Sequence, residues 1–197
     1  MLIGLTGQSG AGKSTVSEIF KENGFFVINA DLVSKAVADS EVGMTALKKA
    51  FGEEYFENGK LNRKKLGALV FENKEMLDKL NNTLLPIISE EIQKMIEKSD
   101  SPLVLLDAPT LFESGIDKNC DAVISVIAPK NVLINRIMER DSLSFNDAEK
   151  RISSQFSEEF FKENSQIVIE NNSTLENLKS NAETALNNLL KKQIYGG

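Results

Sequence analysis

The sequence of 197 residues contains no histidine and only one cysteine. Without histidine there can be no Ser-His-Asp triad, imidazole base or His-ligated zinc site, so carboxylates, lysines, arginines and hydroxyls must carry any chemistry. The single Cys120 excludes an intrachain disulfide. No apolar run approaches the roughly 18 residues that span a bilayer, and no signal-peptide pattern opens the chain. These absences predict a cytoplasmic protein with no membrane partner.

The sequence also has fewer basic than acidic residues. The formal net charge is -6, which argues against a nucleic-acid binder with a broad basic surface. A few convergent lysines and arginines can still hold a small anion on an acidic protein, because local charge decides binding at short range. The composition therefore predicts no nucleic-acid partner but allows a phosphorylated small molecule.

One glycine-rich segment, from Gly7 to Ser14, reads GQSGAGKS. It follows an apolar run and precedes apolar residues at helical spacing, which is the context that separates a phosphate-binding loop from a chance glycine-rich turn. Glycines let backbone amides surround a phosphate, the lysine reaches the terminal phosphates, and the serine hydroxyl can bind Mg²⁺. The residues expected to bind ATP here are Gly7, Ser9, Gly10, Ala11, Gly12, Lys13, Ser14 and Thr15, with Ser14 also a metal ligand.

Five short apolar runs alternate with helical patterns. Strands are expected at 2–6, 25–28, 103–107, 121–127 and 166–170. This alternation predicts an α/β fold with a five-stranded parallel sheet flanked by helices, of the phosphate-loop NTPase and kinase type. We expect a single unit of 1–197 whose core is formed by 1–42, 99–130 and 165–197.

Two helical segments interrupt the core. Residues 43–98 show apolar positions at helical intervals and no strand, with Pro86 marking a break or kink; analogy of fold suggests an acceptor-binding segment. Residues 131–164 contain a basic helical hairpin, typical of a mobile lid over ATP. There, Arg136 and Arg140 would share a helix face that could clamp phosphate, or simply form a solvated charged face.

Two acids follow apolar runs. Asp31 comes after 25–28, and Asp107 closes 103–107. Ligands gather at the carboxyl ends of parallel strands, so both acids are expected on the rim that carries the glycine-rich loop. Asp107 is expected to stand beside Mg²⁺, with capping of a turn as the alternative. For Asp31 the position alone equally favours an N-cap of the next helix.

Several of these stretches, in this order, resemble the dephospho-coenzyme A kinases. The matching segments are the glycine-rich loop, INAD at 28–31, LNR at 61–63, DAP at 107–109 with LFE at 111–113, Arg140-Asp141, and Arg151 with Gln155. The resemblance implies transfer of the ATP γ-phosphate to the ribose 3'-hydroxyl of dephospho-coenzyme A, the last step of coenzyme A synthesis, with Mg²⁺ as cofactor. A kinase for another small hydroxyl acceptor and a nucleotide-hydrolysing switch are the alternatives.

The resemblance also implies roles for single residues. Asp31 would accept the ribose hydroxyl proton, and Lys13 and Arg140 would hold the phosphates and assist catalysis. Arg63 would bind the acceptor, and Asp107 would lie near metal and substrate. Two positions depart from the family pattern: Leu85 replaces a common histidine, and Phe161 stands where a lysine is usual, with Lys162 one residue away.

Overall fold

The computed structural model describes residues 1–195, and the side chains of residues 1–191. The chain divides into two compact units. One combines residues 1–28 with the chain from residue 101 onward, and the other contains residues 29–100.

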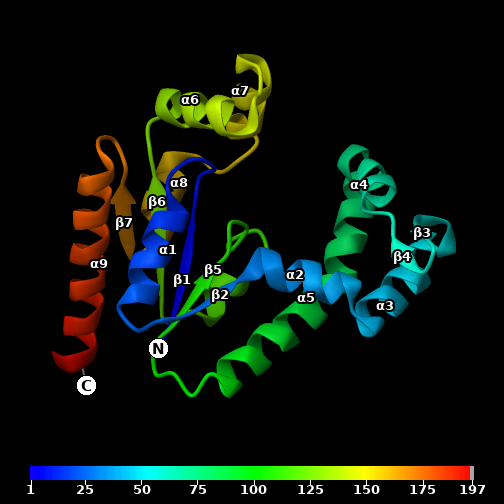
Figure 1. Ribbon diagram of the computed structural model, residues 1–197, viewed down its shortest axis with the longest axis horizontal. Coiled ribbons are helices and arrows are strands. Elements are labelled where there is room, and N and C mark those ends of the chain that lie inside the picture. The colour runs from blue at the N-terminus through cyan, green and yellow to red at the C-terminus, as the bar shows by residue number, and fades with distance from the viewer. Residues whose placement is uncertain (196–197) are drawn as a thin grey trace. The chain divides into compact units, whose positions relative to one another are not determined.

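The first unit is built on a five-stranded parallel sheet with the strand order β2-β5-β1-β6-β7 (Figure 1). The central strand β1 pairs with β5 on one side and β6 on the other, so that Leu5 lies opposite both Asp107 and Ile124. The strands are β1 (Leu2–Gly7), β2 (Phe26–Asn29), β5 (Val104–Asp107), β6 (Ala122–Ile127) and β7 (Ile167–Glu170). The predicted sheet is confirmed.

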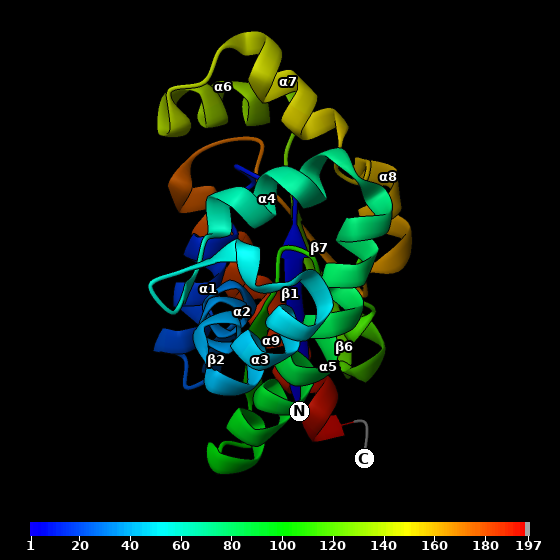
Figure 2. The same cartoon turned by 90° about the vertical axis from the view of Figure 1, so that its right-hand side faces the viewer.

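Helices cover both faces of this sheet. Helices α1 and α9 pack together on one face, and α8 contacts β6 and β7 from the other (Figure 1). Helices α6 and α7 form a hairpin beyond the carboxyl ends of β1 and β6, as both views show (Figures 1 and 2). Their bounds are α1 (Lys13–Glu22), α6 (Lys130–Asp141), α7 (Phe145–Ser153), α8 (Glu158–Asn164) and α9 (Leu175–Tyr195), with a short 3-10 helix at Ile116–Asn119.

Alternating side chains explain why the strands are buried on both faces. Along β6, Ile124 and Val126 join the core that α1 and α9 share. Phe20, Leu5 and Ile137 in the same core are fully buried. Burial of one such side chain stabilises the fold by about 1.5–3 kcal/mol. This rigid core holds the carboxyl ends of the strands in place.

The second unit is helical. Helix α5 packs against α2, α3 and α4, and a small core forms around Leu47, Phe51 and Leu66. The helices are α2 (Ala30–Asp39), α3 (Glu41–Phe51), α4 (Arg63–Glu72) and α5 (Lys74–Lys98), with a 3-10 turn at Glu53–Tyr55.

One expectation for this region is wrong, because residues 43–98 do contain strands: β3 (Phe56–Glu57) and β4 (Lys60–Leu61) pair as an antiparallel hairpin. Of the break or kink expected at Pro86, the break does not occur, since α5 runs continuously from Lys74 to Lys98. Proline removes one backbone hydrogen bond, but packing against three other helices stabilises α5 across that position.

Across the part of the chain that the structure describes, no helix combines the length and the apolar character needed to cross a membrane.

Candidate functional site

The loop between β1 and α1 requires glycine at particular positions. Gly7, Gly10 and Gly12 all have positive φ, of 134°, 81° and 102°. A Cβ on Gly7 would lie 2.0 Å from the carbonyl oxygen of Val126, and one on Gly12 would lie 2.8 Å from Nδ2 of Asn171. Both backbone conformation and close packing therefore exclude larger residues at these two positions.

Side chains from distant segments hold the loop carbonyls. Nη1 of Arg136 donates to the carbonyl of Gly10 at 3.2 Å, and Nδ2 of Asn171 donates to that of Ala11 at 2.8 Å. In a trans peptide the carbonyl and the following N–H point in opposite directions. The Gly12 N–H therefore points away from Asn171, on the side where the first amides of α1 can meet an anion.

Lys13 is the first residue of α1 and folds back over the loop. Its Nζ donates to the carbonyl of Gly7 at 2.9 Å. Ser14 follows it with an exposed side chain. A flexible cation and a hydroxyl thus lie together at the helix N-terminus, where the helix dipole favours negative charge.

Asp107 ends β5 beside this loop. It lies opposite Leu5 in the parallel register, and the next residue, Ala108, donates its N–H to the carbonyl of Leu5 at 3.0 Å. Its side chain is buried. The hydroxyl of Thr6 donates to the carbonyl of Pro109 at 3.2 Å, which holds the chain after β5 against β1. Asp107 is therefore brought to the edge of the sheet that carries the loop.

Arg140 lies at the end of α6, next to its ion-pair partner. Its guanidinium makes two 2.8 Å hydrogen bonds to Asp141, and Nη1 of Arg151 reaches the same carboxylate at 2.6 Å. The hydrogen bond from Arg140, reinforced by Arg151, lowers the pKa of Asp141 to about 2. Nη2 of Arg140 also lies 3.5 Å from the hydroxyl of Ser9, so this arginine does reach the loop.

Arg136 does not lie on the solvated charged face that was one of its two expected places. It is half-buried, and its guanidinium binds Gly10 and the side chain of Asn171, at 3.3 Å for the latter. It does not form a solvated face with Arg140. Arg136 therefore supports the loop by binding its backbone at Gly10.

A small cavity opens next to the loop. Its volume is about 230 Å³, and it is lined by Gly10, Gly12, Thr15, Arg136, Asn171, Leu175 and Leu178. The sequence interpretation missed Asn171 and Leu175. Asn171 directly follows β7, so the rule that carboxyl ends of parallel strands meet at one edge was the available signal.

In the second unit, Asp31 lies in the first turn of α2 with an exposed side chain. The N-cap of this helix is Asn29, whose Oδ1 accepts the N–H of Leu32 at 2.9 Å. The alternative interpretation of Asp31 as the cap is therefore wrong. Its carboxylate is not used to begin the helix.

Arg63 begins α4 and contacts the far end of α2. Its Nη2 lies 2.8 Å from Oδ1 of Asp39 and donates to the carbonyl of Lys35 at 3.1 Å. Positions 31, 35 and 39 are four residues apart, so they follow one another along one face of α2. Arg63 thus contacts α2 one to two turns beyond Asp31.

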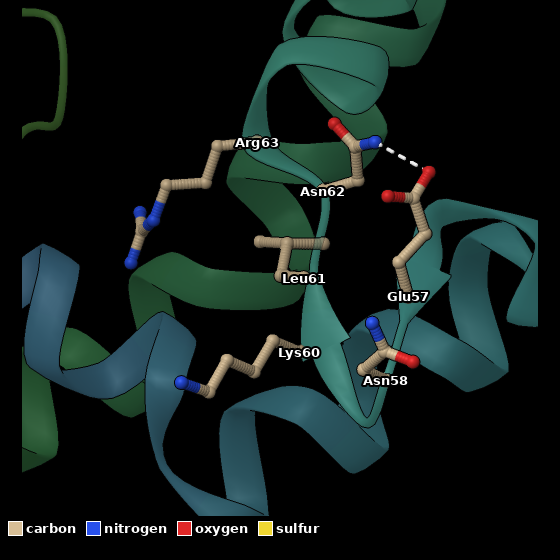
Figure 3. Close-up of a pocket in the computed structure, with 6 residues that line it drawn as sticks. All are labelled: Glu57, Asn58, Lys60, Leu61, Asn62 and Arg63. Carbon is tan, nitrogen blue, oxygen red and sulfur yellow. Dashed lines mark hydrogen bonds between the residues drawn. The ribbon is translucent and has the colours of Figure 1, made fainter.

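A polar pocket of about 540 Å³ lies at the β3–β4 hairpin (Figure 3). Glu57, Asn58, Lys60, Leu61, Asn62 and Arg63 line it. Lys60 and Arg63 extend to the same side of Leu61, while the Asn62 amide turns the other way and donates to Glu57 at 2.7 Å (Figure 3). Two cations therefore face one side of this strand.

Comparison with known proteins assigns the family. The family model described as dephospho-CoA kinase matches residues 1–177. The chain belongs to the dephospho-CoA kinase family. A dephospho-CoA kinase from Fusobacterium nucleatum is 43% identical over 184 residues, covering 93% of this chain and 95% of the relative. One from Oryza sativa is 37% identical, covering 95% of this chain and 84% of the relative.

Solved structures agree with this assignment. A crystal structure from Thermus thermophilus has a TM-score of 0.84 at 31% identity, covering 98% of this chain and 97% of that one. The dephospho-CoA kinase from Campylobacter jejuni has a TM-score of 0.72 at 27% identity, covering 98% of both chains. Shikimate kinase from Acinetobacter baumannii, with a TM-score of 0.58 at 16% identity over 97% and 93% of the two chains, shares the fold. The resemblance, the phosphate-loop kinase fold and the prediction of a kinase are confirmed.

The two departures from the family pattern have clear places in the structure. Leu85 is half-buried on α5. Phe161 is buried among other phenylalanine rings, with its centroid 6.1 Å from that of Phe112. Neighbouring Lys162 pairs with Glu158 at 2.6 Å and Glu170 at 3.5 Å. The family lysine is thus replaced by a packing residue, and Lys162 ties α8 to β7.

Proposed function

We propose that this protein transfers the γ-phosphoryl group of ATP to the ribose 3'-hydroxyl of dephospho-coenzyme A. The observation that carries the proposal is a fully formed phosphate loop in a chain that belongs to this family along nearly its whole length. Phosphoryl transfer requires positioning and charge neutralisation and little other chemistry, which suits a protein without histidine.

The donor half of the site would be the loop and the cavity beside it. Backbone amides at the start of α1 and Nζ of Lys13 would hold the phosphates. The 230 Å³ cavity offers Leu175 and Leu178 as apolar surface and Arg136 as a planar cation, and these groups suit the flat face of an adenine base. Arg140, at the mouth of the loop, would neutralise charge on the transferring group.

A magnesium ion would be held by Ser14 and Asp107. Among residues 1–191, no group of three or more acidic, cysteine or histidine side chains is placed so that it could hold a metal ion. One hydroxyl and one carboxylate fit Mg²⁺, which prefers oxygen ligands and takes the others from water and phosphates. When bound, the ion neutralises charge on the β- and γ-phosphates. Because Asp107 is buried, its carboxylate is held within the protein and does not extend into solvent.

The acceptor half would be the helical unit. Segment 43–98 would bind the coenzyme, with Arg63 and neighbouring Lys60 contacting its diphosphate. Asp31, two residues after the end of β2, would orient the ribose hydroxyl and accept its proton. The hairpin within 131–164 would act as the lid over ATP.

A transfer assay tests the proposal. The protein is incubated with γ-labelled ATP, Mg²⁺ and separate acceptors: dephospho-coenzyme A, a nucleoside monophosphate, a sugar acid, or water alone. We expect label in dephospho-coenzyme A and background elsewhere. Preferred labelling of another acceptor, or release of inorganic phosphate alone at the same rate with and without acceptors, would refute it.

A further inference from the structure

The segment between α7 and α8 touches the phosphate loop directly. Oε1 of Gln155 accepts a 2.8 Å hydrogen bond from the backbone N–H of Ser9, although the two residues are 146 positions apart. Nη2 of Arg140 lies 3.5 Å from the hydroxyl of the same Ser9. Ser9 therefore receives contacts both from α6 and from the segment that follows α7.

Local hydrogen bonds fix Gln155 on its N-terminal side. Its backbone N–H donates to the carbonyl of Ile152 at 3.1 Å, and its Nε2 donates to that of Arg151 at 3.2 Å. Ile152 is buried, and Arg151 is held by Asp141 at 2.6 Å. The side-chain amide is thus oriented, with its nitrogen toward α7 and its oxygen toward the loop.

Aromatic packing fixes the same segment on its C-terminal side. The ring of Phe156 stacks on Phe160, with centroids 3.9 Å apart and planes at 12°. Phe160 meets Phe112 edge-on at 5.3 Å, and Phe112 lies on the chain that follows Asp107. The replacement of the family lysine by buried Phe161 completes this cluster. Little conformational freedom is left for Gln155 to lose when it binds Ser9.

We propose that Gln155 is a positioning residue that sets the phosphate loop for ATP by holding the N–H of Ser9. The carbonyl of Gln8 belongs to the same peptide group as this N–H and accepts the N–H of Ala11 at 3.1 Å. Fixing one end of a planar peptide fixes the other. Gln155 therefore also holds the hydrogen bond that closes the turn.

This contact favours ATP binding and does not compete with it. Ser9 was expected among the ATP-binding residues, but in this structure its N–H is used by Gln155. The amides that begin α1 at Lys13 lie four residues further along the chain, so the Gln155 bond leaves them available for phosphate. A loop that is already shaped loses less conformational entropy when its ligand binds. The inference rests on the proposed function only in taking this loop as the ATP site.

The test compares Gln155→Ala with Ser154→Ala. Both variants remove a hydrogen bond to the carbonyl of Arg151, because Ser154 Oγ donates to it at 2.9 Å, but only Gln155 reaches Ser9. In the ligand-free protein, amide exchange at Ser9 is measured by NMR. Affinity for a non-hydrolysable ATP analogue with Mg²⁺ is measured by calorimetry, and melting temperature reports the global fold.

We expect Gln155→Ala to speed Ser9 exchange and weaken the analogue by about 3- to 10-fold, the range that one net hydrogen bond supports. Ser154→Ala should match the wild type in both measurements. Gln155→Glu keeps an acceptor for Ser9 but adds a negative charge, so it should keep exchange slow while weakening the analogue.

Unchanged exchange or unchanged affinity in Gln155→Ala, or tighter binding, overturns the proposal, and so does an equal effect of Ser154→Ala. None of these measurements needs an acceptor. Failure to phosphorylate dephospho-coenzyme A would refute the proposed function and leave this result standing.

Discussion

Asp31 is the residue on which the proposed chemistry depends most. Its side chain is exposed in the first turn of α2. The N-cap of this helix is Asn29, so Asp31 is not needed as the cap. A carboxylate that is not needed to begin its helix is available for a substrate hydroxyl.

Replacement of this carboxylate should affect turnover and not ATP binding. Asp31→Asn keeps the shape of the side chain and removes its ability to accept a proton, so we expect kcat to fall by about 100-fold or more. The Michaelis constant for ATP should change little. Steady-state kinetics with Asp78→Asn, an exposed acid on α5, provides the matched control, and a normal kcat in Asp31→Asn would remove Asp31 from the mechanism.

The sequence pattern predicted where the backbone needs glycine in the loop between β1 and α1. The residues of the glycine-rich loop are consecutive, so their spacing alone carries the geometry that Gly7 and Gly12 then show. The residues that hold the loop in place could not be found from the spacing of residues along the chain. Asn171 and Gln155 are held close to it by the fold, through single hydrogen bonds that leave no periodic signal in the chain.

At the scale of elements, turn chemistry and packing explain what the sequence interpretation missed. The β3–β4 turn is Asn58-Gly59, and both residues have positive φ, of 50° and 77°. Asn-Gly at such a turn is a strong hairpin signal, but strands of two residues are too short to show alternation. In α5, tertiary packing overrides the breaking tendency of Pro86, and no local pattern reveals that packing.

Asp141 links helix α6 to helix α7. It accepts hydrogen bonds from Arg140 on its own helix and from Arg151 on the next. Arg140 first, and Arg151 after it, lower the pKa of this carboxyl to about 2. An aspartate in an unfolded chain has a pKa of about 3.9. The ionised carboxylate therefore stabilises the fold fully above pH 4, and this stabilisation is lost as the pH falls toward 2.

The pairing of Asp141 with Arg140 and Arg151 predicts that the stability of the fold depends on pH. Asp141→Asn should unfold more easily than the wild type at pH 7, and the difference in the free energy of unfolding should shrink as the pH falls from 4 to 2. Denaturant unfolding at a series of pH values measures this difference. A carboxyl NMR titration should find Asp141 near 2, and Arg140→Gln should raise that midpoint. A difference that stays constant down to pH 2 would contradict the pairing.

At the scale of the whole molecule, the five strands follow from apolar runs, but their order does not. The sheet places β5 between β2 and β1, although β5 comes some 75 residues after β2 along the chain. The intervening residues form a unit with its own core. Strand order depends on which faces pack together, and a list of segments does not contain that information.

The two units carry different groups of candidate site residues. The first carries the loop, Asp107 and Arg140, which suit a nucleotide and its metal. The second carries Asp31 and the cations Lys60 and Arg63 beside a polar pocket. The central claim is that the donor half acts on one particular hydroxyl of the acceptor.

Two acceptor analogues test this claim most directly. The wild-type protein is given γ-labelled ATP and Mg²⁺ with dephospho-coenzyme A, its 3'-deoxy analogue or its 2'-deoxy analogue, and the labelled product is quantified. We expect transfer to the natural acceptor and to the 2'-deoxy analogue, and none to the 3'-deoxy analogue. Transfer to the 3'-deoxy analogue, or to neither analogue nor dephospho-coenzyme A itself, would contradict it.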